Sequence, residues 1–139
     1  MKLNFDCIRA TMLSLEKLLT IQHDHRDNLY MEAVDLRALY ADLPKFSRED
    51  IYYAVVNLAQ AGYIDFNGQY ADGGLLLYGE VSDINFAGHE FLGQIRDKEQ
   101  WSIVKTGLSK VRDYSLSAIS AIAEGITKVA IDKYIGSLS

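Results

Sequence analysis

Apolar residues near the start of the chain repeat with the period of an α-helix, which places them along one side of it. This stripe consists of Ile8, Met12, Leu15 and Leu19. The residues outside it include Arg9, Ser14 and Lys17, as expected of a solvent-facing side. We therefore predict a helix from Asp6 to about Thr20, followed by a polar loop over residues 23–28. Residues 29–31 could add a short strand.

Two further helices are predicted on either side of the single proline of the chain. The apolar residues from Val34 to Tyr40 indicate a short helix that ends before Pro44, because the residue preceding a proline is pushed out of the helical region. Ser47 is a good cap for the next helix, and the acidic residues after it suit the positive end of the helix dipole. Gly62 is a natural stop for that helix.

The period changes after the third helix, where strand-forming residues alternate with turn-forming ones. Residues 63–66 and 75–84 indicate two strands. The sequences Asn67-Gly68 and Asp72-Gly73-Gly74 between them have the composition of turns. Together these features predict a β-hairpin.

The remainder of the chain has the pattern of helices. Asn85 and Asp97 can each cap one. The apolar residues from Leu116 to Ala130 mark a long C-terminal helix with a broad apolar face. This helix either docks on the rest of the chain or pairs with its copy in a dimer.

This order of elements predicts an α+β fold, mainly α, of the winged-helix type, in which three helices are followed by a β-hairpin wing. We place the winged-helix-like domain at residues 1–95 and a helical C-terminal extension at residues 96–139. The extension either packs on the first domain or mediates dimerisation. A fold of this type does not by itself assign DNA binding.

Composition narrows the class of protein. With 139 residues, 49% hydrophobic residues and a net charge of −5, the chain has the length and apolar content of a packed globular domain. A single cysteine excludes a disulfide scaffold. No segment has the ~18 uninterrupted apolar residues of a membrane span. We therefore expect a cytoplasmic protein without a membrane partner.

The charge is distributed unevenly along the chain. Residues 1–66 carry 7 basic and 10 acidic side chains. Residues 67–95 carry no basic and 4 acidic side chains, and residues 96–139 carry 7 basic and 5 acidic ones. The sums are −3, −4 and +2, so the helix and wing with which a winged helix would contact DNA lie in the acidic part. Only residues 96–112 approach a basic patch, and this segment is the one that favours an anionic partner.

Several motifs resemble those of a known family. The most specific is Gly88-His89-Glu90-Phe91-Leu92, followed by Ile95-Arg96-Asp97 and Trp101. The opening residues 1–9 and the segments 50–53 and 61–64 add to the similarity. Together they resemble the domain of unknown function 2513 family, small proteins found mainly in phages, prophages and other mobile elements. The resemblance implies a winged-helix-like domain in a mobile-element setting and supplies no established activity. The motif residues that we expect to be structural are Gly88, His89, Glu90, Arg96, Asp97 and Trp101.

Motifs for catalysis are incomplete. His89-Glu90 resembles the start of a zinc-protease helix, but Gly93 stands where a second histidine is needed one turn later. We expect His89 to hydrogen-bond to the wing or to the first helix, with an uncharacterised activity at His89 and Glu90 as the alternative. Cys7 adjoins the buried stripe and is expected to be a small buried side chain.

Motifs for metal binding are incomplete as well. The loop that contains His23, Asp24, His25 and Asp27 lacks the cysteines and the rigidity of a physiological zinc site. We therefore predict no enzymatic activity, no metal, no cofactor and no small-molecule substrate.

The outward face of the helix after Ser47 is the leading candidate site. Opposite its apolar side it presents Tyr53, Val56, Asn57 and Gln60. A tyrosine beside an aliphatic residue is typical of a protein contact. Alternatively, the C-terminal helix of the same chain covers Tyr53 and Val56.

We therefore predict a non-enzymatic binding module that acts mainly through protein–protein contact, with another protein or a second copy of the chain as its partner. The alternative is a winged-helix DNA-binding regulator, because amide and basic side chains read bases and phosphates. Its contacts would be Lys45, Arg48, Asn57 and Gln60, with a contribution from the basic segment 96–112.

Overall fold

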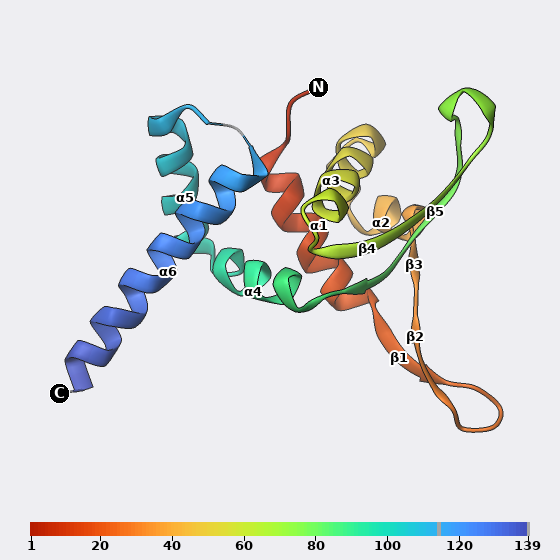
Figure 1. Cartoon of the computed structure of the whole chain (residues 1–139), viewed down its shortest axis with the longest axis horizontal. Helices are drawn as coiled ribbons and strands as arrows, with labels where there is room; N and C mark the ends of the chain where they lie inside the picture. The colour runs from red at the N-terminus through yellow and green to blue at the C-terminus, as the bar shows by residue number, and fades with distance from the viewer. Residues whose placement is uncertain (114, 139) are drawn as a thin grey trace.

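The computed structural model describes residues 1–113 and 115–138 as an α+β fold that is mainly helical (Figure 1). The helices are α1 (Phe5–Leu18), α2 (Leu36–Asp42), α3 (Arg48–Gln60), α4 (Phe86–Ile95), α5 (Lys98–Val111) and α6 (Leu116–Leu138). The strands are β1 (Thr20–His23), β2 (Leu29–Glu32), β3 (Val34–Asp35), β4 (Ile64–Tyr70) and β5 (Leu76–Ile84).

Side-chain caps begin three helices at the positions that the sequence predicts. The Ser47 hydroxyl accepts a hydrogen bond from the backbone N–H of Asp50 at 3.1 Å, which starts α3. The Asp97 carboxylate accepts one from Gln100 at 2.9 Å, which starts α5, and Asn85 caps α4 in the same way. Each bond satisfies a backbone donor that a helix leaves free in its first turn. These predicted helix starts are confirmed.

Strand β5 lies at the centre of a three-stranded antiparallel sheet with the order β3-β5-β4. The predicted hairpin is confirmed as β4 and β5, but the predicted turn at Asn67-Gly68 is wrong, because both residues belong to β4 and pair with Glu80 and Gly79 of β5. Its tip holds Gly73 and Gly74 at φ 82°, a left-handed conformation that glycine adopts without steric cost. Helix α2 is shorter than predicted, because Val34 does not join the helix. It belongs to β3, where it pairs with Val81 of β5.

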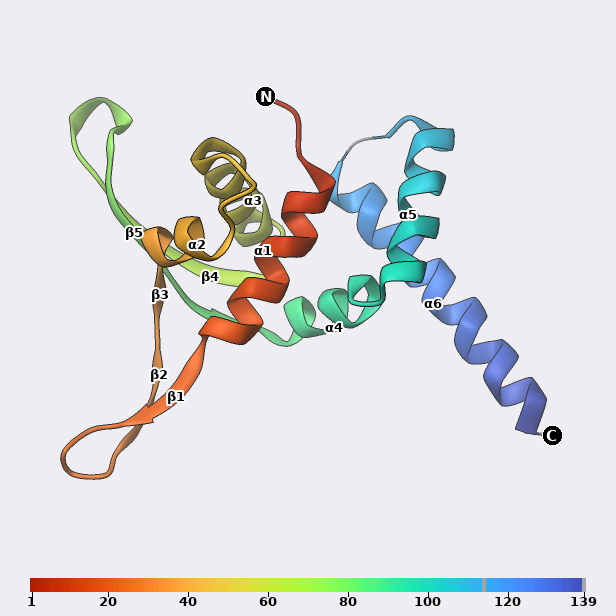
Figure 2. The ribbon, with the colours of Figure 1, turned by 180° about the vertical axis from the view of Figure 1, so that it is seen from behind.

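A second hairpin, formed by β1 and β2, projects from the body of the molecule beyond the end of α1 (Figure 2). The predicted strand at residues 29–31 is confirmed, but the segment before it is also a strand, Thr20–His23, which the sequence does not predict. The turn is closed by Asp24, whose carboxylate accepts the backbone N–H groups of Arg26 and Asn28 at 2.8 and 3.0 Å. All four residues of β1 are exposed, so no buried face marks the strand in the sequence.

Helix α1 packs against α2, α3 and α4. Three residues of its predicted stripe are buried, since Ile8, Met12 and Leu15 are 0% exposed, but the fourth, Leu19, is half-buried and lies one residue beyond the end of the helix. The expectation that Ser14 faces solvent is wrong: this residue is 3% exposed, and its hydroxyl donates to the Asp42 carboxylate at 2.5 Å. A helix with neighbours on several sides buries more than one stripe, and its polar residues then need partners.

Helix α6 has a packed half and a projecting half (Figure 1). Leu116, Ile119 and Ala123 are buried, and α6 packs on α4 and α5. Val129 and Ala130 continue the predicted apolar face but are exposed, because the helix extends beyond its neighbours there. The buried residues of α5 and α6 belong to the same core cluster as those of α1 to α4. Within residues 1–113 and 115–138, no helix combines the length and hydropathy needed to cross a membrane.

Candidate protein-contact site

Helices α2 and α3 line a hollow of about 450 Å³ on the surface of the molecule. Its lining residues are Met1, Tyr40, Arg48, Glu49, Tyr52 and Tyr53. We call this hollow the tyrosine groove. Half of the residues that line it are tyrosines, and all three tyrosine side chains are half-buried.

The packing of α3 determines how these tyrosines are presented. Ile51, Ala54 and Val55 are buried in the core, so α3 is held by the side opposite to the solvent. Tyr52 and Tyr53 lie between these buried positions and are therefore left at the boundary between core and solvent. A rigid helix with a fixed buried side presents such aromatic residues at little further cost in side-chain entropy.

A pair of hydroxyl groups ties the groove to the β4–β5 hairpin. The hydroxyls of Tyr52 and Tyr70 are 2.8 Å apart, and the ring of Tyr52 lies 6.4 Å from that of Phe66 at a tilt of 51°. The hydrogen bond with Tyr70, together with burial, raises the pKa of Tyr52 to about 12. Burial also raises the pKa of Tyr40. Tyr40 and Tyr52 are therefore neutral hydrogen-bonding groups at physiological pH.

A second hollow of about 230 Å³ continues the groove toward the hairpin. Tyr40 and Arg48 line both hollows. The hairpin side contributes Leu77, which is 62% exposed, and Tyr78, whose hydroxyl donates to Glu80 at 2.9 Å. The result is one continuous surface made mainly of aromatic, aliphatic and arginine side chains, with Glu49 and Asp35 as its acidic members. That composition is typical of the centre of a protein–protein interface.

The four predicted protein-contact residues do not all reach this surface. Tyr53 lines the groove, and Val56 is half-buried. The Asn57 amide donates to the backbone carbonyl of Tyr53 at 2.8 Å, and Gln60 is exposed at the end of α3. Sequence analysis misses Tyr40 and Tyr52, because the groove forms between two helices and cannot be derived from one helix face.

The two cationic residues among the predicted DNA contacts lie in different hollows. Arg48 lines the tyrosine groove. Lys45, only three residues earlier, lines a different hollow between α1 and α5, and its ammonium lies 5.2 Å from the centre of the Phe46 ring. A single phosphate-tracking face would need these cations side by side.

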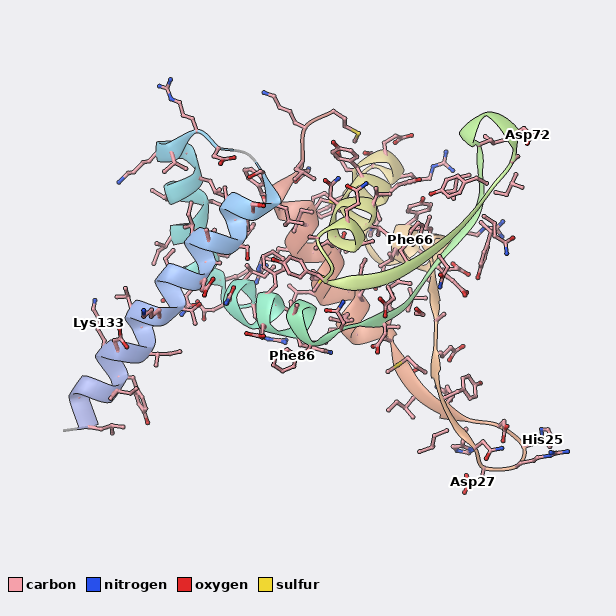
Figure 3. All side chains as sticks on the ribbon, in the orientation of Figure 1. His25, Asp27, Phe66, Asp72, Phe86 and Lys133 are labelled. Carbon is pink, nitrogen blue, oxygen red and sulfur yellow. The ribbon has the colours of Figure 1, made fainter. Side chains whose placement is uncertain are left out.

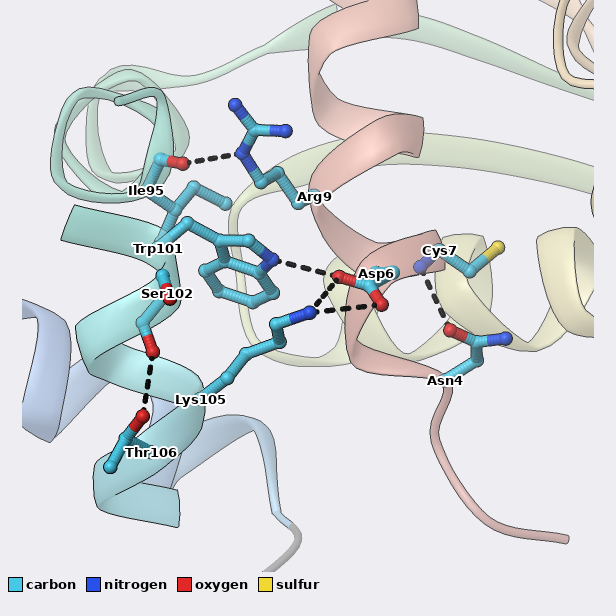
Figure 4. A network of polar contacts seen from close by, with 9 residues as sticks. All are labelled: Asn4, Asp6, Cys7, Arg9, Ile95, Trp101, Ser102, Lys105 and Thr106. Carbon is cyan, nitrogen blue, oxygen red and sulfur yellow. Dashed lines mark hydrogen bonds and ion pairs between the residues drawn. The ribbon is translucent and has the colours of Figure 1, made fainter. Parts of the chain in front are cut away.

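Four of the motif residues make contacts that hold elements together. Gly88 lies so close to the sheet that an added Cβ would stand 2.0 Å from the carbonyl oxygen of Tyr63. Arg96 forms two hydrogen bonds with the Glu16 carboxylate, and Asp97 caps α5. Trp101 is 4% exposed and donates its indole N–H to Asp6 at 2.9 Å (Figure 4).

The other two motif residues, His89 and Glu90, are exposed. Within the described part of the chain, the His89 side chain has no hydrogen bond to the hairpin or to α1, so the expected bond is absent there. On the facing helix α1, the hydrogen bond from Arg96 and the charge of Arg96 lower the pKa of Glu16. Glu90 lines a hollow of about 160 Å³ between α4 and α6 that also contains Glu124.

The remaining candidates for chemistry are separated or buried. His25 and Asp27 lie at the tip of the β1–β2 hairpin (Figure 3), and His23 is 3.6 Å from Asp27. Among residues 1–113 and 115–138, no three His, Cys, Asp or Glu side chains gather where they could hold a metal ion. Cys7 is confirmed as a buried side chain, and burial raises the pKa of its thiol to about 11.

Comparisons with known proteins identify relatives of the chain. The family model described as "Hypothetical protein (DUF2513)" matches residues 2–114. A protein of Haemophilus influenzae described as "Uncharacterized protein" is 30% identical over 127 residues, which make up 91% of this chain and 95% of the relative. No solved structure matches the chain.

Proposed function

The chain belongs to the family described as Hypothetical protein (DUF2513), and we propose that it is a non-enzymatic binding module that acts through protein–protein contact. Apart from the β1–β2 hairpin, which follows α1, the order of elements is α1-β3-α2-α3-β4-β5 with β5 between β3 and β4, and this order supports a winged-helix domain for this module. The phage or mobile-element setting that the family resemblance implies is part of the same proposal.

The tyrosine groove is the observation that supports this function. Tyrosine and arginine are the residues most often found at energetic centres of protein interfaces, and the groove brings Tyr40, Tyr52, Tyr53 and Arg48 together. Because tyrosine buries a large rigid surface and keeps a hydroxyl for hydrogen bonding, such a groove suits a short apolar segment with polar edges. We propose that a segment of a partner protein binds there.

The charge of the surface favours protein over DNA. Residues 67–95, which include most of the β4–β5 hairpin, carry no lysine or arginine and four acidic residues. A duplex presents a dense line of phosphates, and an acidic wing would repel it. The DNA-binding alternative is also weakened by the separation of Lys45 from Arg48 described above.

A second copy of the chain is another candidate partner. On the projecting half of α6, Ile131, Tyr134 and Leu138 follow the spacing of a helical stripe and are 51%, 66% and 69% exposed. Pairing of these stripes would give a dimer of about twice 15.6 kDa by light scattering, whereas a monomer at high concentration would contradict self-association through α6.

The groove is tested by selecting binders from a random-peptide display library on the wild-type protein. We expect enriched peptides whose affinity, measured by fluorescence polarisation, falls roughly 10- to 30-fold in Tyr52→Ala or Arg48→Ala, as expected of a central interface residue. Tyr30→Ala, in the exposed strand β2, is the matched control and should leave the affinity unchanged. Circular dichroism of each variant verifies that it is folded.

Two results would contradict the proposal. One is a set of peptides that bind equally well to wild type and to Tyr52→Ala. The other is tight, steeply salt-dependent binding of duplex DNA that is lost in Arg48→Ala, because that pattern identifies the same surface as a phosphate contact.

A further inference from the structure

The hollow between α1 and α5, which shares no lining residue with the tyrosine groove, is rich in positive charge. It has a volume of about 390 Å³ and lies between α1, the segment that joins α2 to α3, and α5. Its charged residues are Arg9, Lys45, Lys98, Lys105 and Asp6. We call it the cationic hollow. Four cations against one carboxylate give a formal charge of 4 − 1 = +3, on a chain whose net charge is −5.

Folding creates this concentration of charge. Arg9 comes from α1, Lys45 from the segment before α3, and the other two lysines from one side of α5. Because the net charge of the chain is −5, residues outside the hollow must sum to −8. A cluster of like charges is unfavourable unless something compensates it, and the hollow contains one carboxylate for four cations.

Several of these groups are held in position by the protein itself (Figure 4). The Arg9 guanidinium donates to the carbonyl oxygens of Ile95 and Arg96 at 2.8 and 2.5 Å, which fixes it at the end of α4. Lys105 donates to both oxygens of Asp6 at 3.1 and 3.3 Å. Arg9 therefore needs little reorganisation to face a ligand, whereas Lys105 has to leave Asp6 to contact one.

The single carboxylate is already occupied. Asp6 accepts hydrogen bonds from Trp101 and Lys105. Partial burial would raise the pKa of Asp6, but these hydrogen bonds and the charges of Lys105 and Lys45 outweigh it, so the pKa lies below its ordinary value. Lys98 is exposed and forms no ion pair within the described part of the chain. The charges of Arg9, Lys45 and Lys98 thus remain available to an anion.

We propose that the cationic hollow binds a phosphate-bearing ligand. Lysine ammonium groups act as strong point charges toward phosphate, and a guanidinium adds directional donors. An acidic peptide fits less well, because peptide interfaces depend on apolar anchors. The aromatic surface here offers no such anchor site, since Trp101 is 4% exposed and Lys45 lies over the ring of Phe46.

The site contains its own spectroscopic reporter. Trp101 is the single tryptophan of the chain, and its indole N–H is bonded to Asp6 inside the hollow. An anion that draws Lys105 toward itself changes the environment of that bond. Titration with potassium pyrophosphate at constant ionic strength should therefore produce a saturable change in tryptophan fluorescence, and potassium chloride at the same ionic strength should not.

Charge variants locate the binding. Lys98→Gln and Lys45→Gln should each weaken pyrophosphate binding roughly three- to tenfold, because each removes one nearby charge. Asp6→Asn should strengthen it by a similar factor, measured by calorimetry because this substitution also alters the tryptophan signal. Lys133→Gln, on the projecting half of α6 (Figure 3), is the control of equal charge change and should bind as wild type.

A parallel titration with a short DNA duplex distinguishes the source of the phosphate. Saturable binding of pyrophosphate supports a free phosphate compound. Binding of the duplex alone, with the same dependence on Lys98 and Lys45, supports a nucleic-acid backbone. The proposal is overturned if neither probe binds beyond the chloride control, or if Lys98→Gln binds as tightly as wild type. No residue lines both this hollow and the tyrosine groove, so that result would leave the proposed protein contact unaffected.

Discussion

Gly88 offers the sharpest test of how α4 is attached to the sheet. A Cβ atom at this position would stand 2.0 Å from the carbonyl oxygen of Tyr63, whereas ordinary contact begins near 3.4 Å. The obstacle is backbone, so no side-chain rotation can relieve the clash. In Gly88→Ala the start of α4 must therefore move by about 1.4 Å (3.4 − 2.0) relative to the segment that enters β4.

The hydrogen bonds at this junction resist that movement. The backbone N–H of Asn85 donates to the Tyr63 carbonyl at 3.2 Å, and the Asn85 side-chain amide donates to the Gly62 carbonyl at 2.6 Å. Overpacking costs about 1–3 kcal/mol, and each weakened hydrogen bond about 1 kcal/mol. The better helix propensity of alanine returns about 1 kcal/mol. We therefore expect Gly88→Ala to lower the free energy of unfolding by about 3 kcal/mol, and the melting temperature by roughly 10 °C.

Gly93 provides the matched control on the same helix. It is exposed, and a Cβ placed there would have no atom within 4 Å. The identical substitution, Gly93→Ala, should therefore stabilise the protein by about 0.5–1 kcal/mol. Urea unfolding followed by circular dichroism measures both variants. Equal stability of the two would refute the close contact between α4 and the entry to β4.

Three further predictions follow from local contacts. Ser47→Ala removes the cap of α3 and should lower the free energy of unfolding by about 1 kcal/mol. The midpoint of urea unfolding should fall while the dependence of that free energy on urea concentration stays the same, and an unchanged midpoint would contradict the cap. Cys7 should resist a thiol reagent in the folded protein and react on unfolding, because it is buried with a raised pKa; fast labelling of the native state would contradict this. Folding lowers the pKa of Asp6, so its ionised form stabilises the protein above the unfolded-state pKa, and this contribution disappears as the pH falls through the folded-state pKa. Asp6→Asn should therefore be less stable than wild type at neutral pH and equal to it in acid, and a difference that persists in acid would exclude the charge as its cause.

The predictions that succeed depend on neighbours in sequence. A cap such as Ser47, Asn85 or Asp97 accepts a hydrogen bond from a backbone N–H three residues later, so a helix start can be recognised from a few adjacent residues of the sequence. The β4–β5 hairpin is likewise specified by adjacent strands and by the glycines at its tip. The exposed strand β1 is missed, because residues that face solvent on both sides leave no apolar alternation to detect.

The candidate sites are less predictable, because they join residues that are distant in sequence. The tyrosine groove needs Tyr40 beside Tyr52, and its hydroxyl pair needs Tyr52 beside Tyr70. Helical periodicity identifies the outward side of α3 but not which segment lies next to it. The same limit explains why the sequence suggests a basic segment at residues 96–112 but not the contribution of Arg9 and Lys45 to one hollow.

Four of the six motif residues that carry the family resemblance hold elements of the fold together. Gly88 allows α4 to approach the sheet, Arg96 binds Glu16 on α1, and Trp101 binds Asp6 on the same helix. These contacts secure α4 and α5 against the core, and securing them also forms one wall of the cationic hollow. A chain that kept only this motif would keep these contacts, while the two binding surfaces proposed above also need the tyrosines of α2 and α3 and the lysines around the hollow. Function in relatives of this chain is therefore better compared at those surface positions than at the motif itself.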